Sequence, residues 1–161
     1  MDKKKIGLAE VLGGAGLLLL GKKKLGLTLF AKGLYDLERV YRETHEDLAS
    51  GFAARWERSV EYYEETHQNE TNRTLHRLGI PVILCGTVGL IASKPYNNLW
   101  KASAGAFTAG WALNIAGHSL YEKNSPAFAE DPLSFVMGPA WDLKQYIEAK
   151  KGSAEFDERL E

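Results

Sequence analysis

The fold is decided by the stretch LWKASAGAFTAGWALNIAGHSLYEK, residues 99–123, in which small or polar residues occur at every fourth position. Residues four apart share one face of an α-helix, so the stretch predicts a long helix with one distinctive face. The first half of that face is small, which allows a second helix to approach closely. The second half is polar. The positions concerned are Ala102, Ala106, Gly110, Asn114, His118 and Glu122.

The neighbouring segments are also predicted to be helical. Upstream, a helix over residues 72–78 is expected to stop at Gly79 and Pro81, because the residue before a proline resists the helical conformation. A new helix should then run from Pro81 to Ala92. Downstream, two short segments, 132–137 and 139–149, are expected after Ser125 and Pro126 end the long helix.

Residues 35–66 are predicted to form one long amphipathic helix or two stacked helices, because apolar residues recur with helical spacing. Ser50 and Gly51 mark the expected break. The opposite face, which includes Glu38, is charged and is expected to be solvated. The apolar stripe consists of Leu37, Tyr41, Leu48, Phe52, Trp56, Val60 and Tyr63, and His67 continues it four residues later.

Two Gly- and Leu-rich pieces, 6–20 and 25–34, are separated by Gly21 and three lysines. They predict a helical hairpin that lies in or dips into a membrane, with the lysines reaching the lipid headgroups. No apolar run reaches the ~18 residues of a clear membrane span. The predicted fold class is therefore all-α: a compact multi-helix bundle, membrane-embedded or membrane-associated, with an N-terminal helical hairpin.

The length, charge and cysteine content limit the kinds of fold, binding partner and metal site that the chain can have. The length of 161 residues favours a single domain, and the net charge of −1 gives no general attraction to nucleic acid. The single cysteine, Cys85, excludes a disulfide within the chain and a cysteine-based zinc site. It lies in an apolar run and is expected to be a small buried hydrophobic residue.

Two dense polar clusters interrupt the apolar helices: HQNETNRTLHRLGIP, residues 67–81, and NIAGHSLYEKNSPA, residues 114–127. Buried polar groups are unfavourable unless they are paired or bound to something. His67 and His76 are nine positions apart, which would place them on opposite sides of one continuous helix. The chain is therefore expected to end a helix and start another between them, with Asn69 and Asn72 as candidate N-caps.

Imidazole and carboxylate groups in these clusters are the ligand types of catalytic metals. We expect His67, His76, His118 and Glu122 to converge on one divalent metal in the bundle. This donor set resembles the 2-His-1-carboxylate sites of non-haem iron enzymes, which keep a position open for O2 or substrate. The residues expected to orient the ligands are Tyr63, Asn69, Asn72 and Asn114. The alternative is that the same polar groups satisfy one another without a metal.

The two clusters also resemble the family of small helical membrane proteins typified by the 2-hydroxy-fatty-acid dioxygenase of fatty-acid α-oxidation. In that family a His, an Asn and a His precede Gly-x-Pro, and a Gly-His, a Glu four residues on and a Pro-Ala follow. The resemblance covers about residues 62–141. The matching residues are His67, Asn72, His76, Gly79, Pro81, Gly117, His118, Glu122, Pro126 and Ala127.

This resemblance implies an Fe(II)-dependent enzyme that uses O2 to shorten a long-chain 2-hydroxy fatty acid by one carbon at a membrane. It divides the chain into residues 1–58, which lie outside the family pattern, a metal-binding core over 59–149, and a charged tail over 150–161. The implied partners are the 2-hydroxy fatty acid, O2 and membrane lipid in an inner membrane or the endoplasmic reticulum, with oligomerisation left open.

In this catalytic hypothesis the acyl tail lies along the small-residue face near Ala102, Ala106 and Gly110. The candidate partners of the substrate carboxylate are Arg73, Arg77 and Lys123. Two other functions remain open at the level of sequence. One is a non-catalytic membrane helix bundle whose polar clusters are structural or bind lipid, and the other is a zinc-dependent membrane hydrolase.

Overall fold

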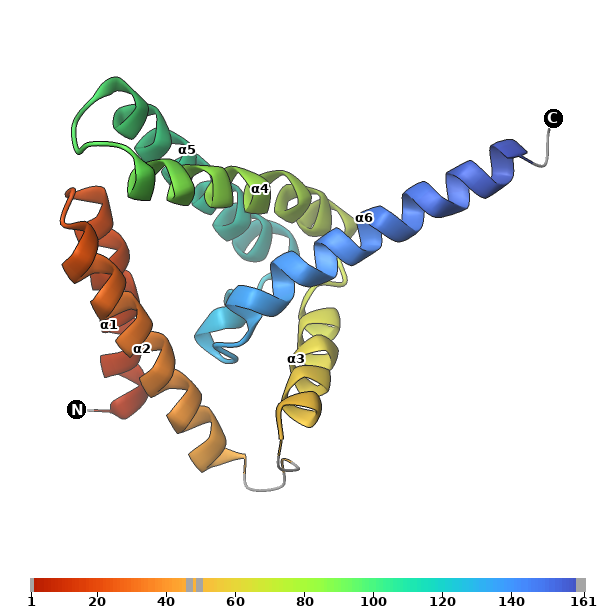
Figure 1. Cartoon of the computed structure of the whole chain (residues 1–161). Helices are drawn as coiled ribbons and strands as arrows, with labels where there is room; N and C mark the ends of the chain where they lie inside the picture. The colour runs from red at the N-terminus through yellow and green to blue at the C-terminus, as the bar shows by residue number, and fades with distance from the viewer. Residues whose placement is uncertain (1, 46–47, 49–50, 159–161) are drawn as a thin grey trace.

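The computed structural model of the protein describes residues 2–45, 48 and 51–158, and these residues form helices and no strand (Figure 1). The predicted all-α class is confirmed. The elements are α1 (Lys3–Leu19), α2 (Lys23–Thr44), α3 (Phe52–Thr66), α4 (Glu70–Ala92), α5 (Asn98–Ala116), the π-helical turn η1 (Gly117–Glu122), the 3-10 turn η2 (Ala127–Ala129) and α6 (Ser134–Glu158).

The first two helices form the predicted hairpin, which turns at Gly21 with a φ of 71°. Their backbones touch through glycines. A Cβ atom on Gly26 would lie 2.8 Å from the Gly14 carbonyl oxygen, and one on Gly33 would lie 2.7 Å from the Val11 nitrogen. Gly26 and Gly33 are two turns apart on one face of α2, so this face can only pack against backbone. The expected end of the second piece at residue 34 is wrong, because the apolar periodicity continues and α2 runs to Thr44.

Residues 35–66 belong to two helices rather than one. Helix α2 ends at Thr44, and α3 begins after Gly51, which has a φ of 116° that favours glycine. The predicted break is therefore found at Gly51, while Ser50 lies outside the described residues. Leu37, Tyr41 and Tyr63 of the apolar stripe are buried, whereas Phe52 is exposed.

A buried cation joins three parts of the chain, and the sequence did not indicate it. The Arg55 side chain is 1% exposed, and its Nη1 donates to Asp131 Oδ2 at 3.0 Å while its Nε donates to Glu38 Oε1 at 2.9 Å. Its guanidinium carbon lies 4.0 Å from the centre of the Tyr41 ring. The expectation of a fully solvated face is thus wrong for Glu38, because this carboxylate neutralises a cation that is out of water.

Helix α4 is continuous through Pro81, so the predicted stop at Gly79 and Pro81 is wrong. Proline weakens a helix interior, but tertiary packing against α5 stabilises α4 on both sides of Pro81. A Cβ atom on Gly79 would lie 2.9 Å from the Gly110 carbonyl oxygen, and one on Gly86 would lie 2.6 Å from the Phe107 nitrogen. The close approach expected at Gly110 is therefore found.

Two other predicted elements differ. The long helix over 99–123 changes from α-helix to the π-helical turn η1 at Gly117 and ends at Lys123, which adopts a left-handed φ of 59°. The two short C-terminal segments are one helix, α6, which includes Pro139 and extends through Glu158 of the expected tail. Residues 159–161 lie outside the described part of the chain. Cys85 is exposed rather than buried.

Two clusters of buried apolar side chains connect the described helices. Leu18, Leu90 and Trp100 join the hairpin to the α4–α5 pair. Tyr63 and Met137 join α3 to α6.

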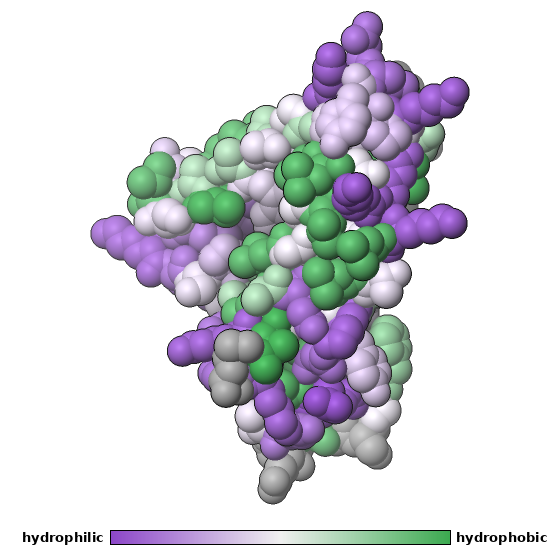
Figure 2. Space-filling model, turned by 90° about the vertical axis from the view of Figure 1, so that its left-hand side faces the viewer, coloured by the Kyte–Doolittle hydropathy of each residue, from purple (hydrophilic) through white to green (hydrophobic). Residues whose placement is uncertain are grey.

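Among the described residues, α4 is the helix long and apolar enough to cross a membrane, and only 22% of its apolar window is buried. Its exposed large apolar residues are Leu78, Leu84, Val88 and Ile91. On the face that carries the hairpin, Figure 2 shows apolar side chains in the middle and hydrophilic ones crowded at the upper end.

Prediction: an Asp131→Ala substitution leaves a buried guanidinium with one partner fewer and should lower the free energy of unfolding by about 3 kcal/mol. Chemical denaturation followed by circular dichroism measures this loss. The control is Lys3→Ala, which removes an exposed ion pair with Glu43 and should leave the denaturation midpoint unchanged. Equal midpoints for wild type and Asp131→Ala would contradict a stabilising role for the Arg55 cluster.

Candidate metal centre

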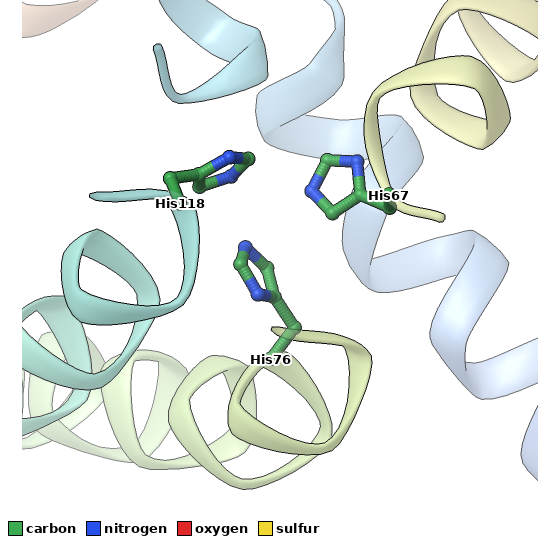
Figure 3. Close-up of side chains that lie close together, drawn as sticks. All are labelled: His67, His76 and His118. Carbon is green, nitrogen blue, oxygen red and sulfur yellow. The ribbon is translucent and has the colours of Figure 1, made fainter. Parts of the chain in front are cut away.

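Three histidines that are far apart in the chain meet at one point (Figure 3). His67 ends α3, His76 lies in α4 and His118 lies in η1. Their ring centroids are 4.8 to 4.9 Å apart, and one nitrogen of each ring lies within 4.8 Å of the other two. Nitrogens bound to one ion at ~2.1 Å can be at most about 4 Å apart, so ring movements of less than about 1 Å would complete the set.

Each ring is held by a hydrogen bond at its Nδ1 atom. His67 Nδ1 lies 2.8 Å from the Tyr63 carbonyl oxygen, and His76 Nδ1 lies 3.0 Å from the Asn72 carbonyl oxygen. Because a carbonyl oxygen only accepts, Nδ1 carries the proton in both rings. The Nε2 atoms then keep their lone pairs, which is the tautomer that binds a metal through Nε2.

His118 obtains the same tautomer from a side chain. Its Nδ1 lies 2.7 Å from Asn124 Oδ1, and Asn124 Nδ2 donates to the Thr66 carbonyl oxygen at 3.0 Å. The second bond fixes the amide so that its oxygen faces the imidazole. Asn124 was missed at the level of sequence, although it lies in the second polar cluster and has the acceptor that a histidine needs.

Contacts at the C-terminal end of α3 fix the orientation of the His67 ring. Thr66 Oγ1 donates to the Tyr62 carbonyl oxygen at 2.8 Å, and the His67 ring stacks on the Tyr63 ring with centroids 3.7 Å apart. Tyr63 therefore contacts the His67 ring through both its carbonyl oxygen and its aromatic ring.

The same Tyr-x-x-Thr-His sequence ends α2. There His45 Nδ1 lies 2.8 Å from the Tyr41 carbonyl oxygen, and the two rings stack at 4.0 Å. No internal repeat was predicted from the sequence. His45 is not in the group of described residues that could share a metal. The motif is therefore a way of ending a helix that also orients an imidazole.

The chain restarts as a helix between His67 and His76, as predicted. The Asn69 side chain caps α4 by accepting from Thr71 N at 2.9 Å and Asn72 N at 3.3 Å. His118 comes from a different device, the π-helical turn that follows Gly117. Such turns insert an extra residue and change the direction of the side chains beside them, often at functional sites.

Glu122 is not brought into the histidine cluster. Its Oε1 accepts from the Asn69 backbone N–H at 2.7 Å and from Asn72 Nδ2 at 3.2 Å. In the described part of the chain, the group of candidate ligands consists of the three histidines alone. Glu122 thus ties η1 to the start of α4, which positions two of the ligand-bearing segments relative to each other.

The electrostatic environment favours neutral imidazoles. Burial and the neighbouring His76 lower the pKa of His67 to about 3, and burial lowers the pKa of His118. His67 Nε2 is buried and finds no hydrogen-bond partner among the described residues. An unpaired buried nitrogen is unfavourable, and a divalent cation would satisfy it. The donor set therefore fits a metal.

A cavity of about 560 Å³ adjoins the histidines, within the range of ligand-binding pockets. The three histidines and Asn114 line it, and most of its other lining residues are apolar. The expected groove over Ala102, Ala106 and Gly110 is wrong, because Gly110 packs against α4 and the cavity follows Phe107 and Trp111 instead.

Of the remaining candidates, Asn114 lines the cavity and the three cationic residues do not. Asn114 is buried beside Gly79, and its Oδ1 has no partner among the described residues. None of the expected carboxylate partners, Arg73, Arg77 and Lys123, is among the described residues that line the cavity. The Arg73 guanidinium carbon lies 4.9 Å from the centre of the Trp141 ring.

Arg73 and Arg77 influence the pKa of Asp142. Burial raises the pKa of Asp142 to about 6, and Arg77 and Arg73 oppose this rise.

Together, the fold and the site define a helical protein with a three-histidine centre beside an apolar cavity. The chain belongs to the 2-hydroxy-palmitic acid dioxygenase Mpo1-like family, whose model matches residues 53–150. No curated protein and no solved structure matches the chain.

Prediction: the metal-free protein should lose stability as the pH falls from about 6.5 toward 3. The His67 pKa is about 3 in the folded protein against an ordinary value of 6.5, so in this window the unfolded chain binds a proton that the folded chain excludes. A proton excluded in this way changes the unfolding free energy by about 1.4 kcal/mol per pH unit. Asp142 acts in the opposite direction, so the measurement is the difference in slope between wild type and His67→Gln. His45→Gln is the matched control. Because burial also lowers the pKa of His118, part of the slope should remain in His67→Gln, and a slope equal to that of wild type would refute the assignment.

Prediction: Asn124→Ala should weaken metal binding by about 10- to 100-fold, because the His118 ring loses the acceptor that fixes its orientation. Metal titration of the purified apoprotein measures the affinity. Ser125→Ala, a change at the neighbouring exposed residue, is the control. An unchanged affinity in Asn124→Ala would show that the His118 ring needs no such support.

Proposed function

We propose that the protein is an Fe(II)-dependent dioxygenase that shortens long-chain 2-hydroxy fatty acids by one carbon. The observation that carries this proposal is the convergence of three buried imidazoles, all in the Nε2-binding tautomer, at a cavity that is otherwise mostly apolar. All three lie within the residues matched by the family.

His67, His76 and His118 would hold the iron, and three protein ligands leave further coordination positions free. Iron bound there would supply the site for O2 and for the α-hydroxy-carboxylate group. Glu122 Oε1 accepts hydrogen bonds from Asn69 and Asn72, and Glu122 is not in the group of described residues that lie close enough to share one ion. We therefore propose that Glu122 positions the ligands rather than binding the metal.

The cavity supports a fatty-acid substrate over a polar one. The described residues that line it include no Lys, Arg, Asp or Glu, so no protein cation there can neutralise the substrate carboxylate. That charge would have to be held by the metal, and the tail would be surrounded by apolar side chains.

The same lining bears on the two alternatives. A zinc hydrolase could use three histidines, but it also needs a general base, and no carboxylate lines the described cavity. A purely structural cluster would be expected to pair its buried nitrogens, whereas His67 Nε2 has no hydrogen-bond partner in the described part of the chain. Both observations favour the dioxygenase.

We further propose that the protein works at a membrane, where its substrate dissolves. The exposed apolar residues of α4 support this location, because four large apolar side chains there are between 41% and 66% exposed. The exposed lysines near the two ends of α1, Lys5, Lys22 and Lys24, would face the lipid headgroups.

Prediction: anaerobically purified protein should contain close to one iron per chain and should consume O2 when given 2-hydroxypalmitate. His76→Ala removes one of three ligands, so iron should be lost and the rate should fall by more than about 100-fold, beyond the loss typical of residues that only orient ligands. Elemental analysis and an oxygen electrode measure the two quantities.

The matched control is His45→Ala, because His45 has the same local setting as His67 and lies outside the cluster. It should keep both iron and activity. Zinc in place of iron would support the hydrolase, and a metal-free protein that stays equally stable without His67 or His118 would support the structural role.

A further inference from the structure

The N-terminal hairpin lies outside the family match, yet it lines the same cavity as the histidines. The family covers residues 53–150, whereas the hairpin comprises α1 and α2. Both hairpin helices contribute to the cavity wall. The residues concerned include Ala15 and Leu18 of α1 and Leu27, Phe30 and Leu34 of α2.

The hairpin is fixed to the family core at both ends. At its turn, Lys23 Nζ donates to the Ile91 carbonyl oxygen at 2.7 Å, and the Tyr96 hydroxyl donates to the Leu20 carbonyl oxygen at 2.8 Å. At the opposite end, Glu38 pairs with the buried Arg55. The segment between these attachments is therefore held in place as one wall of the cavity.

This wall lies away from the metal centre. In Figure 1 the hairpin occupies one side of the molecule, and the segment that joins α3 to α4 is on the other. His67 is the first residue of that segment. A fatty acid whose carboxylate is at the histidines would thus extend its tail toward the hairpin. The lining residues of the hairpin are all apolar or glycine, as a methyl-terminated tail requires.

We propose that the N-terminal hairpin forms the end wall of the acyl-chain site and thereby sets the longest chain that the protein accepts. This inference rests on the proposed function. The hairpin takes no part in holding the metal, so it acts on selectivity for chain length and leaves the chemistry at the histidines unchanged.

Ala15 is the position that tests this wall, because it is a small lining residue where added volume would enter the cavity. Phenylalanine there should shorten the space for the tail. One methylene in an apolar pocket is commonly worth about 10- to 200-fold in discrimination. We therefore expect Ala15→Phe to weaken palmitate binding by at least about 10-fold and to leave octanoate binding unchanged.

The experiment uses the full-length protein and measures binding of octanoate, laurate and palmitate by competition with a dansyl-labelled fatty acid, so the result does not depend on turnover. Ala9→Phe is the matched control, because Ala9 lies on the exposed side of α1 away from the cavity. A second pair covers a folding failure of Ala15→Phe. Leu27→Trp alters the wall from α2, and Leu25→Trp alters an exposed residue that does not line the cavity.

The expected result is a loss that grows with chain length in both wall variants and in neither control. An equal loss for all three acids, an unchanged palmitate affinity, or the same loss in the controls would overturn the inference.

Iron content and O2 consumption with 2-hydroxyoctanoate, measured on the same preparations, separate this result from the proposed function. Wild type that binds palmitate but holds no iron and consumes no O2 would refute the dioxygenase alone. Wall variants that keep iron and activity without changed selectivity would refute the wall alone.

Discussion

The centre depends on one constraint: each histidine donates its Nδ1 proton to a fixed oxygen, so its Nε2 lone pair is available. The acceptors are the Tyr63 and Asn72 carbonyls and the Asn124 amide, and each belongs to a different local structure. The helix end at His67, the Asn69 cap and the π-helical turn at Gly117 all serve to bring these acceptors to the correct places. Burial then keeps His67 neutral and ready to bind a cation.

A second constraint, close contact between backbones, builds the scaffold around the centre. Glycines allow α1 to pack closely against α2 and α4 to pack closely against α5, so each of the two helix pairs has backbone in contact with backbone. Because the glycine faces are used within each pair, larger side chains such as Phe30 and Phe107 are left to line the cavity between them.

Local signals in the sequence were sufficient for the helical class, the hairpin, the cap at Asn69 and the three converging histidines. They failed where tertiary contacts decide the outcome. Proline at position 81 is a helix-stop signal, but packing against α5 overrides it. The ion pair of Arg55 with Asp131 joins residues far apart in the chain, and no periodicity reports such a pair. Glu122 has the right spacing for a ligand, yet spacing alone could not show that the backbone of Asn69 competes for its carboxylate.

The sequence Tyr-x-x-Thr-His occurs at the ends of both α2 and α3. Comparing the two ends distinguishes its role in ending a helix from its role in presenting an imidazole to the histidine cluster. At His45 the sequence terminates a helix and stacks the ring, and nothing more is required of it. At His67 the same arrangement faces two further imidazoles, and the three rings together could hold a metal ion. A helix end of this kind already holds an imidazole in a fixed orientation, with its proton on Nδ1 and its Nε2 lone pair available. It is therefore a transferable unit for protein design, to which a metal site can be added by placing two histidines opposite it.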